Sequence, residues 1–390
     1  FVSMALIKTD RGSHKVAQKG IQFLLNSFRF EGEKLGSWPI DTNLATWNTT
    51  LAINALASHP ESFTNDTKGN PQQWTSCVNW VLSCQNRETH PFTGAAPGGW
   101  GWTDLSGAVP DADDTPGALI ALKKIKQLDG YSSGIKNVQS SEIQQAAELG
   151  VDWLIKLQNN DKGWPTFCRG WLKLPFDRSG TDITAHVIRS FITWRDEISD
   201  IKNRKNKVNR AIETGFEYLS QFQEKDGSWL PLWFGNQDMP EDINPFYGTA
   251  KVLMAYRDAN SFDTKEAQFG LRWIRENQNE DGGWGGGPSI QWQNSTLGYS
   301  SVEETALCTE IMLDDPNLES QNAAQNGIRW LLEATESDLI TEPWPIGFYF
   351  AKLWYFEKLY PLIFATSALN RALQLYEDTD RSSAVPKLSN

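Results

Sequence analysis

The apolar positions of the chain follow two kinds of helical pattern. In the first, apolar residues recur three and four positions apart, as at Val151, Leu154 and Ile155, which predicts an amphipathic helix. In the second, apolar residues and alanine fill most positions, which predicts a helix packed on both sides. Six segments show this second pattern: residues 45–57, 115–128, 183–194, 247–256, 302–313 and 362–375.

The two patterns alternate in a sequence repeat. Residues 146–165, 211–230 and 266–285 align without gaps, and in each a glycine lies fourteen residues before a tryptophan in a polar turn. Looser copies cover residues 16–38, 74–100 and 323–344. The turn tryptophans are Trp38, Trp100, Trp164, Trp229, Trp284 and Trp344, spaced 55 to 65 residues apart. Six helical hairpins are therefore predicted.

Six such hairpins bury their apolar faces best as two concentric rings. We therefore expect an all-α fold, an (α/α)6 barrel over residues 16–377, with an N-terminal extension at 1–15 and a C-terminal tail at 378–390. An open solenoid of helix pairs is the alternative. The turn tryptophans are expected to fill gaps between hairpins, while Gln158, Gln223 and Gln278 bond to backbone at helix ends.

The composition narrows the class of protein. With 390 residues, a net charge of -12 and no apolar run of membrane-spanning length, the chain reads as a soluble acidic protein without a general nucleic-acid surface. Four cysteines without a CxxC pair and four histidines offer little for zinc and favour a reduced, cytoplasmic protein. The chain starts at Phe1, so we expect that a segment upstream has been lost.

Three carboxylates lie at the predicted start of the second buried helix. One aspartate is explained as a helix cap, but Asp111, Asp113 and Asp114 repel one another, so one of them keeps its proton. Asp182 and His186 lie at the start of the next buried helix, where a histidine can bond to a carboxylate. An Asp, Asp, His set could also bind a divalent metal.

Aromatic residues accompany this cluster. Their faces stabilise cations without being nucleophiles, so an acid beside them suits protonation of a carbon–carbon double bond. The candidates for contact with substrate are Trp100, Trp102, Trp171, Phe348, Tyr349, Trp354 and Tyr355.

The turns of Q-x-x-x-x-G-x-W type, the stretch PGGWGWTDLSGAVPDADDT (97–115) and TDITAHV (181–187) resemble the squalene-hopene cyclase family of class II terpene cyclases. The resemblance covers residues 16–375. It implies protonation-initiated cyclisation of an isoprenoid, with no cofactor required for the protonation. By this resemblance Asp113 is the proton donor, Asp111 and Asp114 support it, His186 bonds to the acid, and Trp102 and Phe348 stabilise cations.

One departure from the family concerns its second helical barrel, which is inserted after the first helix. Here residues 16–28 run almost directly into the next segment, which leaves no room for that insert. The chain therefore looks like the acid-bearing barrel alone. Its cavity would be closed by a partner domain, by another subunit or by its own loops, and a hydrocarbon substrate would bring it to a membrane surface.

A second departure leaves the substrate open. Arg169, Lys173 and Arg178 lie near the expected cavity mouth, where they would suit a prenyl diphosphate and Mg²⁺ better than squalene, unless they pair with local acids.

Two other functions remain as alternatives. One is an (α/α)6 glycoside hydrolase, which predicts polar cavity walls, and the other is a non-catalytic scaffold that binds a lipid or protein.

Overall fold

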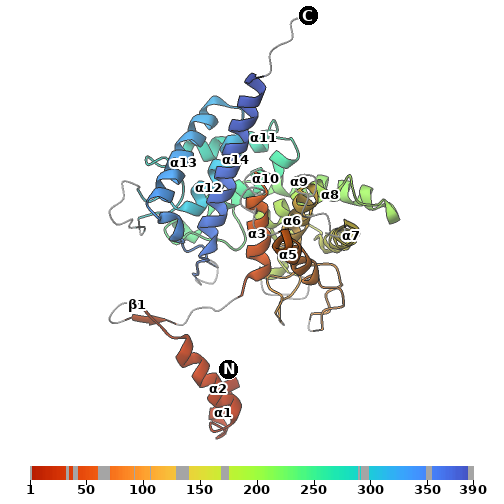
Figure 1. The fold of residues 1–390 in the computed structure, drawn as a ribbon, viewed down its shortest axis with the longest axis vertical. Coiled ribbons are helices and arrows are strands. Elements are labelled where there is room, and N and C mark those ends of the chain that lie inside the picture. Colours follow the sequence, from red (N-terminus) through yellow and green to blue (C-terminus); the bar gives the residue numbers. More distant parts are fainter. Residues whose placement is uncertain are drawn as a thin grey trace, which may run out of the picture. The chain divides into compact units, whose positions relative to one another are not determined.

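The computed structural model describes residues 2–31, 35–37, 43–59, 71–91, 93–105, 107–128, 140–167, 175–288, 290, 298–347 and 354–384 (Figure 1). The chain divides into two compact units, Phe1–Asn43 and Leu44–Asn390. The division falls at residue 44, whereas we placed the start of the barrel domain at residue 16. The smaller unit thus contains the helix that we expected to open the barrel.

The smaller unit is a helical pair followed by a short hairpin. Helices α1 (Val2–Lys8) and α2 (Lys15–Ser27) pack together, and β1 (Arg29–Glu31) pairs antiparallel with β2 (Leu35–Ser37). His14 caps α2, since its Nδ1 accepts a hydrogen bond from the Val16 amide at 3.2 Å.

The core of the larger unit is a closed ring of six helices. Each helix packs on the next in sequence order, and the last packs on the first. They are α3 (Ala45–Leu56), α6 (Asp114–Leu128), α8 (Thr181–Trp194), α10 (Pro245–Asp258), α12 (Val302–Asp314) and α14 (Leu359–Ala384). This closure confirms the α/α barrel and excludes the open solenoid. Helix α14 continues to Ala384, beyond the predicted start of the tail at residue 378.

The amphipathic helices of the larger unit alternate with those of the ring. They are α5 (Pro71–Ser83), α7 (Ser140–Leu157), α9 (Arg204–Gln221), α11 (Lys265–Glu276) and α13 (Leu318–Glu336). Figure 1 shows α12, α13 and α14 side by side, in agreement with their contacts. Short elements fill the connections: β3 (Trp164–Pro165), β4 (Ser179–Gly180), and the 3₁₀ turns η1 (Pro175–Asp177), η2 (Ile201–Asn203), η3 (Pro240–Asp242) and η4 (Leu339–Thr341). Among the described residues, no helix is long and apolar enough to cross a membrane.

Four of the six turn tryptophans bond to their own repeats in the same way, whereas the indole N–H of Trp344 has no partner among the described residues and Trp38 lies outside them. The indole N–H of Trp229 donates to the carbonyl of Leu219 at 2.7 Å, and its backbone N–H donates to the Thr249 hydroxyl at 2.9 Å. Trp100, Trp164 and Trp284 make the same two kinds of bond. Because the threonine belongs to the next ring helix, each tryptophan joins a turn to the start of that helix.

The glutamines and early glycines of the repeat join neighbouring hairpins. Gln223 donates to the carbonyls of Gly227 in its own turn and Glu266 at the start of α11, both at 2.9 Å. A Cβ on Gly270 would lie 2.6 Å from Cζ3 of Trp229, so only glycine lets this ring approach α11. The tryptophan of one repeat therefore packs against the glycine of the next, which confirms the predicted structural role of the turn tryptophan.

We expect Gly270→Ala to destabilise the protein by about 1–2 kcal/mol. Overpacking costs about 1–3 kcal/mol, and the better helix propensity of alanine offsets up to about 1 kcal/mol of it. Denaturant unfolding of this variant, of Trp229→Phe and of the double variant measures the coupling. Purely additive effects would show that the tryptophan ring is not what crowds position 270.

Candidate active site

Asp111 forms the cap at the start of α6. Its Oδ1 accepts hydrogen bonds from the backbone amides of Asp113 at 3.0 Å and Asp114 at 2.6 Å. The segment ahead of the helix is fixed on both sides, because the Asp111 amide donates to the Trp100 carbonyl and that of Ala112 to the Thr166 carbonyl. The capping role predicted for one aspartate thus belongs to Asp111.

Burial disfavours negative charge on the carboxyl cluster. It raises the pKa of Asp114 to about 8, and that of Asp111 well above its ordinary value, to which the Asp114 charge adds. A side-chain hydrogen bond joins these two carboxyls, which requires a proton on one of them. The shared proton predicted from the sequence therefore has a physical basis.

The carboxyl of Asp113 is arranged differently. It accepts no hydrogen bond from any other described residue, and Asp113 is half-buried, whereas Asp111 and Asp114 are buried. Burial raises its pKa well above the ordinary value, and the charges of Asp182 and Asp111 raise it further, whereas the Lys251 ammonium lowers it. Burial therefore favours the protonated form of Asp113, and its oxygens are available to a ligand.

His186 does not make the expected bond to an acid. Within the described part of the chain its ring forms no hydrogen bond to Asp111, Asp113 or Asp114. It lies against the first turn of α6, with Cε1 3.6 Å from a Cβ placed on Gly117, and edge-on to Trp47 at 6.2 Å between ring centroids. Burial, Lys251 and Arg189 lower its pKa well below 6.5, so the ring is neutral at pH 7.

The cation near the carboxyl cluster is Lys251, which sequence reasoning missed. It interacts electrostatically with Asp113 and Asp182, and it lies in the middle of α10. The available signal was a lysine inside an otherwise apolar segment, residues 247–256. Asp182 itself is buried; its Oδ1 accepts from the Leu232 amide at 3.2 Å, and burial raises its pKa to about 6.

Four aromatic side chains form a group beside the capped end of α6. Trp102 meets Phe167 edge-on at 5.9 Å, Phe167 meets Phe176 at 5.1 Å, and Phe176 stacks on Trp233 at 5.0 Å between ring centroids. The backbone of Phe167 bridges that of Asp111, so the group adjoins the carboxyl cluster. Only Trp102 was predicted; the other three lie outside the repeat and the recognised motifs.

The remaining predicted contacts divide into four sets. Trp100 is wholly buried against Gly150 of α7, so its place is in the repeat and not in a ligand site. Trp354 and Tyr355 are half-buried, and the Tyr355 hydroxyl bonds to that of Tyr360. Arg178 is exposed and forms no ion pair with another described residue. Five predicted residues lie outside the described residues: Trp171, Phe348, Tyr349, Arg169 and Lys173.

No group of three or more His, Cys, Asp or Glu side chains within the described ranges could hold a metal ion. The Asp, Asp, His set that the sequence suggested as a possible metal site is therefore not arranged to hold a metal ion.

The family model for the squalene-hopene cyclase C-terminal domain matches residues 45–374, from the first ring helix to within the last. The chain belongs to this family. The enfumafungin synthase of Hormonema carpetanum is 27% identical over 339 residues, which are 82% of this chain and 24% of that protein. The squalene–hopene cyclase of Zymomonas mobilis is 26% identical over 291 residues, which are 68% of this chain and 40% of that protein. The chain thus spans less than half the length of these relatives.

Solved structures share the fold at lower identity. The ent-copalyl diphosphate synthase of Streptomyces platensis has a TM-score of 0.54 at 18% identity, over 85% of this chain and 50% of that chain. An α-mannanase of Bacteroides thetaiotaomicron has a TM-score of 0.52 at 11% identity, over 93% and 96%. A terpene cyclase and a glycosidase therefore share this fold, and the chemistry must be argued from the site.

The raised pKa of Asp114 predicts that the stability of the folded protein depends on pH. The pKa rises from 3.8 to about 8 on folding, so the stability associated with the protonated carboxyl is complete below pH 3.8 and is lost as the pH rises to about 8. Asp114→Asn should reduce the fall in the free energy of unfolding over this pH range. The reduction should be about 1.4 kcal/mol for each unit of pKa shift that the substitution removes.

Denaturant unfolding at several pH values between about 4 and about 9 measures this dependence. Asp263→Asn, at an exposed position, is the matched control and should keep the wild-type slope. Equal slopes in the wild type and Asp114→Asn would contradict the assignment.

Proposed function

We propose that this chain is the acid-bearing domain of a class II terpene cyclase, with Asp113 as the proton donor. The observation that carries the proposal is a carboxyl whose pKa burial raises well above its ordinary value, free of hydrogen bonds to the described residues and adjoining a group of aromatic rings. Membership of the squalene-hopene cyclase family supports it.

The reaction begins with transfer of the Asp113 proton to one carbon of a terminal double bond. The other carbon becomes cationic, and successive double bonds of the same chain attack it and form the rings. The low dielectric that disfavours a lone Asp113 carboxylate stabilises that carboxylate once it faces a cation. Loss of a proton from the last cation, or addition of water to it, ends the reaction.

The neighbouring groups take different parts in this step. Asp111 holds the start of α6 through its two backbone hydrogen bonds, and Asp114 shares a proton with it. Trp102 is half-buried in the aromatic group and is suited to facing a cation. His186 supports the first turn of α6 by packing against Gly117.

The substrate is a linear isoprenoid, either a squalene-like polyene or a prenyl diphosphate. Relatives named squalene–hopene cyclase favour the first, and the structural neighbour named ent-copalyl diphosphate synthase favours the second. In the second case Arg169, Lys173 and Arg178 would bind the diphosphate with Mg²⁺, whereas the protonation itself requires no cofactor.

The glycoside hydrolase alternative shares the fold but fits the site less well. It needs two carboxylates placed across a sugar and a polar cavity wall. The side chains packed together beside the carboxyl cluster are aromatic: Trp102, Phe167, Phe176 and Trp233. The scaffold alternative does not account for a buried carboxyl cluster that holds protons.

The surroundings of the chain are part of the proposal. A partner domain, a second subunit or the chain's own loops would close the cavity, because a carbocation must be kept from water. We place the protein in the cytoplasm, with peripheral membrane association if the substrate is a hydrocarbon.

Asp113→Asn should lower cyclisation at least about a thousandfold, because an amide cannot supply the proton. The assay incubates the protein with squalene, farnesyl diphosphate and geranylgeranyl diphosphate, each with and without Mg²⁺, and analyses the products by mass spectrometry. Asp263→Asn is the control. Cyclised product formed by Asp113→Asn at the wild-type rate would rule out Asp113 as the donor.

His186→Gln should have a smaller effect, about tenfold to a hundredfold on kcat, because His186 is neutral and acts through packing. The pH dependence of kcat should be unchanged, since His186 does not titrate near neutrality. A shift of the alkaline limb, where the acid loses its proton, would instead indicate a direct bond between His186 and the acid.

A further inference from the structure

A cavity of about 770 Å³ lies inside the ring of helices. All six ring helices line it, from Asn54 on α3 to Ser367 on α14. Gln127 and Asn260 also line it and are exposed, so the cavity opens to solvent near the C-terminal ends of α6 and α10. Asp113 is not among its lining residues, so this is a separate site from the carboxyl cluster.

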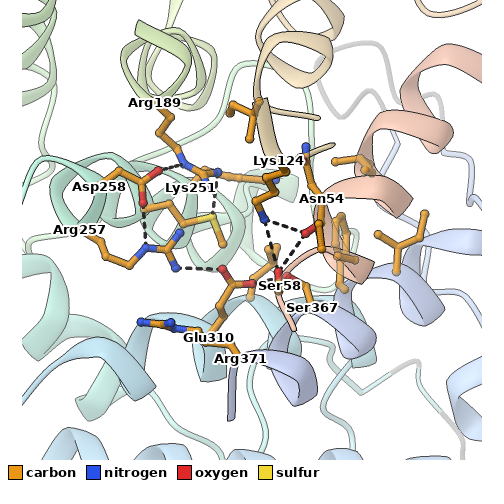
Figure 2. A pocket seen from close by; sticks show the side chains of 18 of the residues that line it. Asn54, Ser58, Lys124, Arg189, Lys251, Arg257, Asp258, Glu310, Ser367 and Arg371 are labelled. Carbon is orange, nitrogen blue, oxygen red and sulfur yellow. Dashed lines mark hydrogen bonds and ion pairs between the residues drawn. The ribbon is translucent and has the colours of Figure 1, made fainter. Parts of the chain in front are cut away.

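Most charges in and beside the cavity cancel. Arg189 donates to Asp258 at 2.7 Å, and Arg257 donates to both Asp258 and Glu310 at 2.9 Å, a series that Figure 2 shows as dashed lines. The complete network contains three arginines and three carboxylates: Arg189, Arg257, Arg371, Asp258, Glu310 and Asp314. Its formal charge is therefore zero.

Two lysines of the lining remain outside this network. Lys124 donates to the Asn54 carbonyl at 2.8 Å and lies 3.5 Å from the Ser58 hydroxyl, both neutral groups at the end of α3 (Figure 2). Burial lowers the pKa of Lys124 to about 8. The ammonium is thus still protonated at pH 7, without a carboxylate bonded to it.

Lys251 has even fewer partners. Its Nζ lies 5.3 Å from the ring centroid of Tyr247 and 5.4 Å from that of Phe364, and it makes no hydrogen bond or ion pair within the described part of the chain. Burial lowers its pKa to about 8 as well, although Glu310, Asp113 and Asp182 attract it without direct contact. A half-buried cation that lines a cavity without a bonded partner marks a candidate binding site.

We propose that this cavity binds a small anion with a phosphate or diphosphate group, which Lys124 and Lys251 hold by their positive charge. The arginine network is neutral by itself, so it does not compensate the positive charges of the two lysines. Ammonium groups bind phosphate oxygens through charge-assisted hydrogen bonds. The opening at Gln127 and Asn260 gives a route from solvent. The group is either a free anion or the head of a phosphorylated isoprenoid.

Calorimetric titration of the whole chain with inorganic diphosphate, without Mg²⁺ and at about pH 8, tests this site. We expect saturable binding of one anion per chain. A bound anion raises the pKa of both lysines, so the protein takes up protons, and the measured enthalpy should differ between buffers of different ionisation enthalpy. Absence of saturable binding at millimolar diphosphate overturns the proposal.

Lys124→Met and Lys251→Met should each weaken binding at least about tenfold, the effect of losing one charged hydrogen bond. Lys126→Met is the matched control, because Lys126 is on the same helix, bonds to Glu197 and does not line the cavity. Unchanged binding by the double variant Lys124→Met/Lys251→Met overturns the proposal. Lys251→Gln replaces Lys251→Met should the latter not fold.

Two further measurements distinguish a free anion from a phosphorylated isoprenoid, and this cavity from the carboxyl cluster. Farnesyl diphosphate that displaces inorganic diphosphate assigns the cavity to the head of a phosphorylated isoprenoid, whereas farnesyl diphosphate that does not displace it assigns the cavity to a free anion. Asp113→Asn should bind diphosphate as the wild type does, so loss of cyclase activity and loss of this site can be told apart.

Discussion

The packing of each turn tryptophan against a glycine of the next hairpin is the interaction on which the barrel depends. The ring of Trp229 fills the space that a side chain at Gly270 would occupy, and the same contact joins Trp164 to Gly215 and Trp284 to Gly327. A large apolar ring in a close-packed interior contributes several kcal/mol, so the repeated contact sets both the spacing and the order of the hairpins. Closure of the ring from α14 to α3 then follows from the number of repeats.

The same repeat positions the carboxyl cluster. Four turn tryptophans, Trp100, Trp164, Trp229 and Trp284, each donate their backbone N–H to a threonine near the start of the next ring helix. For Trp100 that residue is Thr115, directly after Asp114. The structural repeat therefore fixes the helix end that carries the carboxyl cluster. Because this end is buried, the helix cap at Asp111 and the raised pKa of its neighbours have one cause, the exclusion of water.

The repeated features were predictable from the sequence because periodicity is local information. The ring helices, the roles of Trp229 and Gln223, and the capping by an aspartate could all be derived from spacing and residue type, whereas the role of Gly270 emerged only from the structure. The partners of His186 could not, because adjacency at one end of a barrel does not fix which way a ring turns. Phe167, Phe176 and Trp233 were also missed, because they come from connections without a repeat, which meet only after the helices have packed.

Lys251 links the two polar regions of the barrel interior. Its positive charge lowers the pKa of Asp113, while its ammonium faces the cavity that we propose binds an anion. An anion paired with Lys251 would offset that charge and leave Asp113 more firmly protonated, since the low dielectric of the interior screens charges weakly. Occupancy of the cavity and the protonation of the acid are therefore linked by a single side chain. A methionine or leucine, the ordinary residues of a ring helix, would leave the two regions independent.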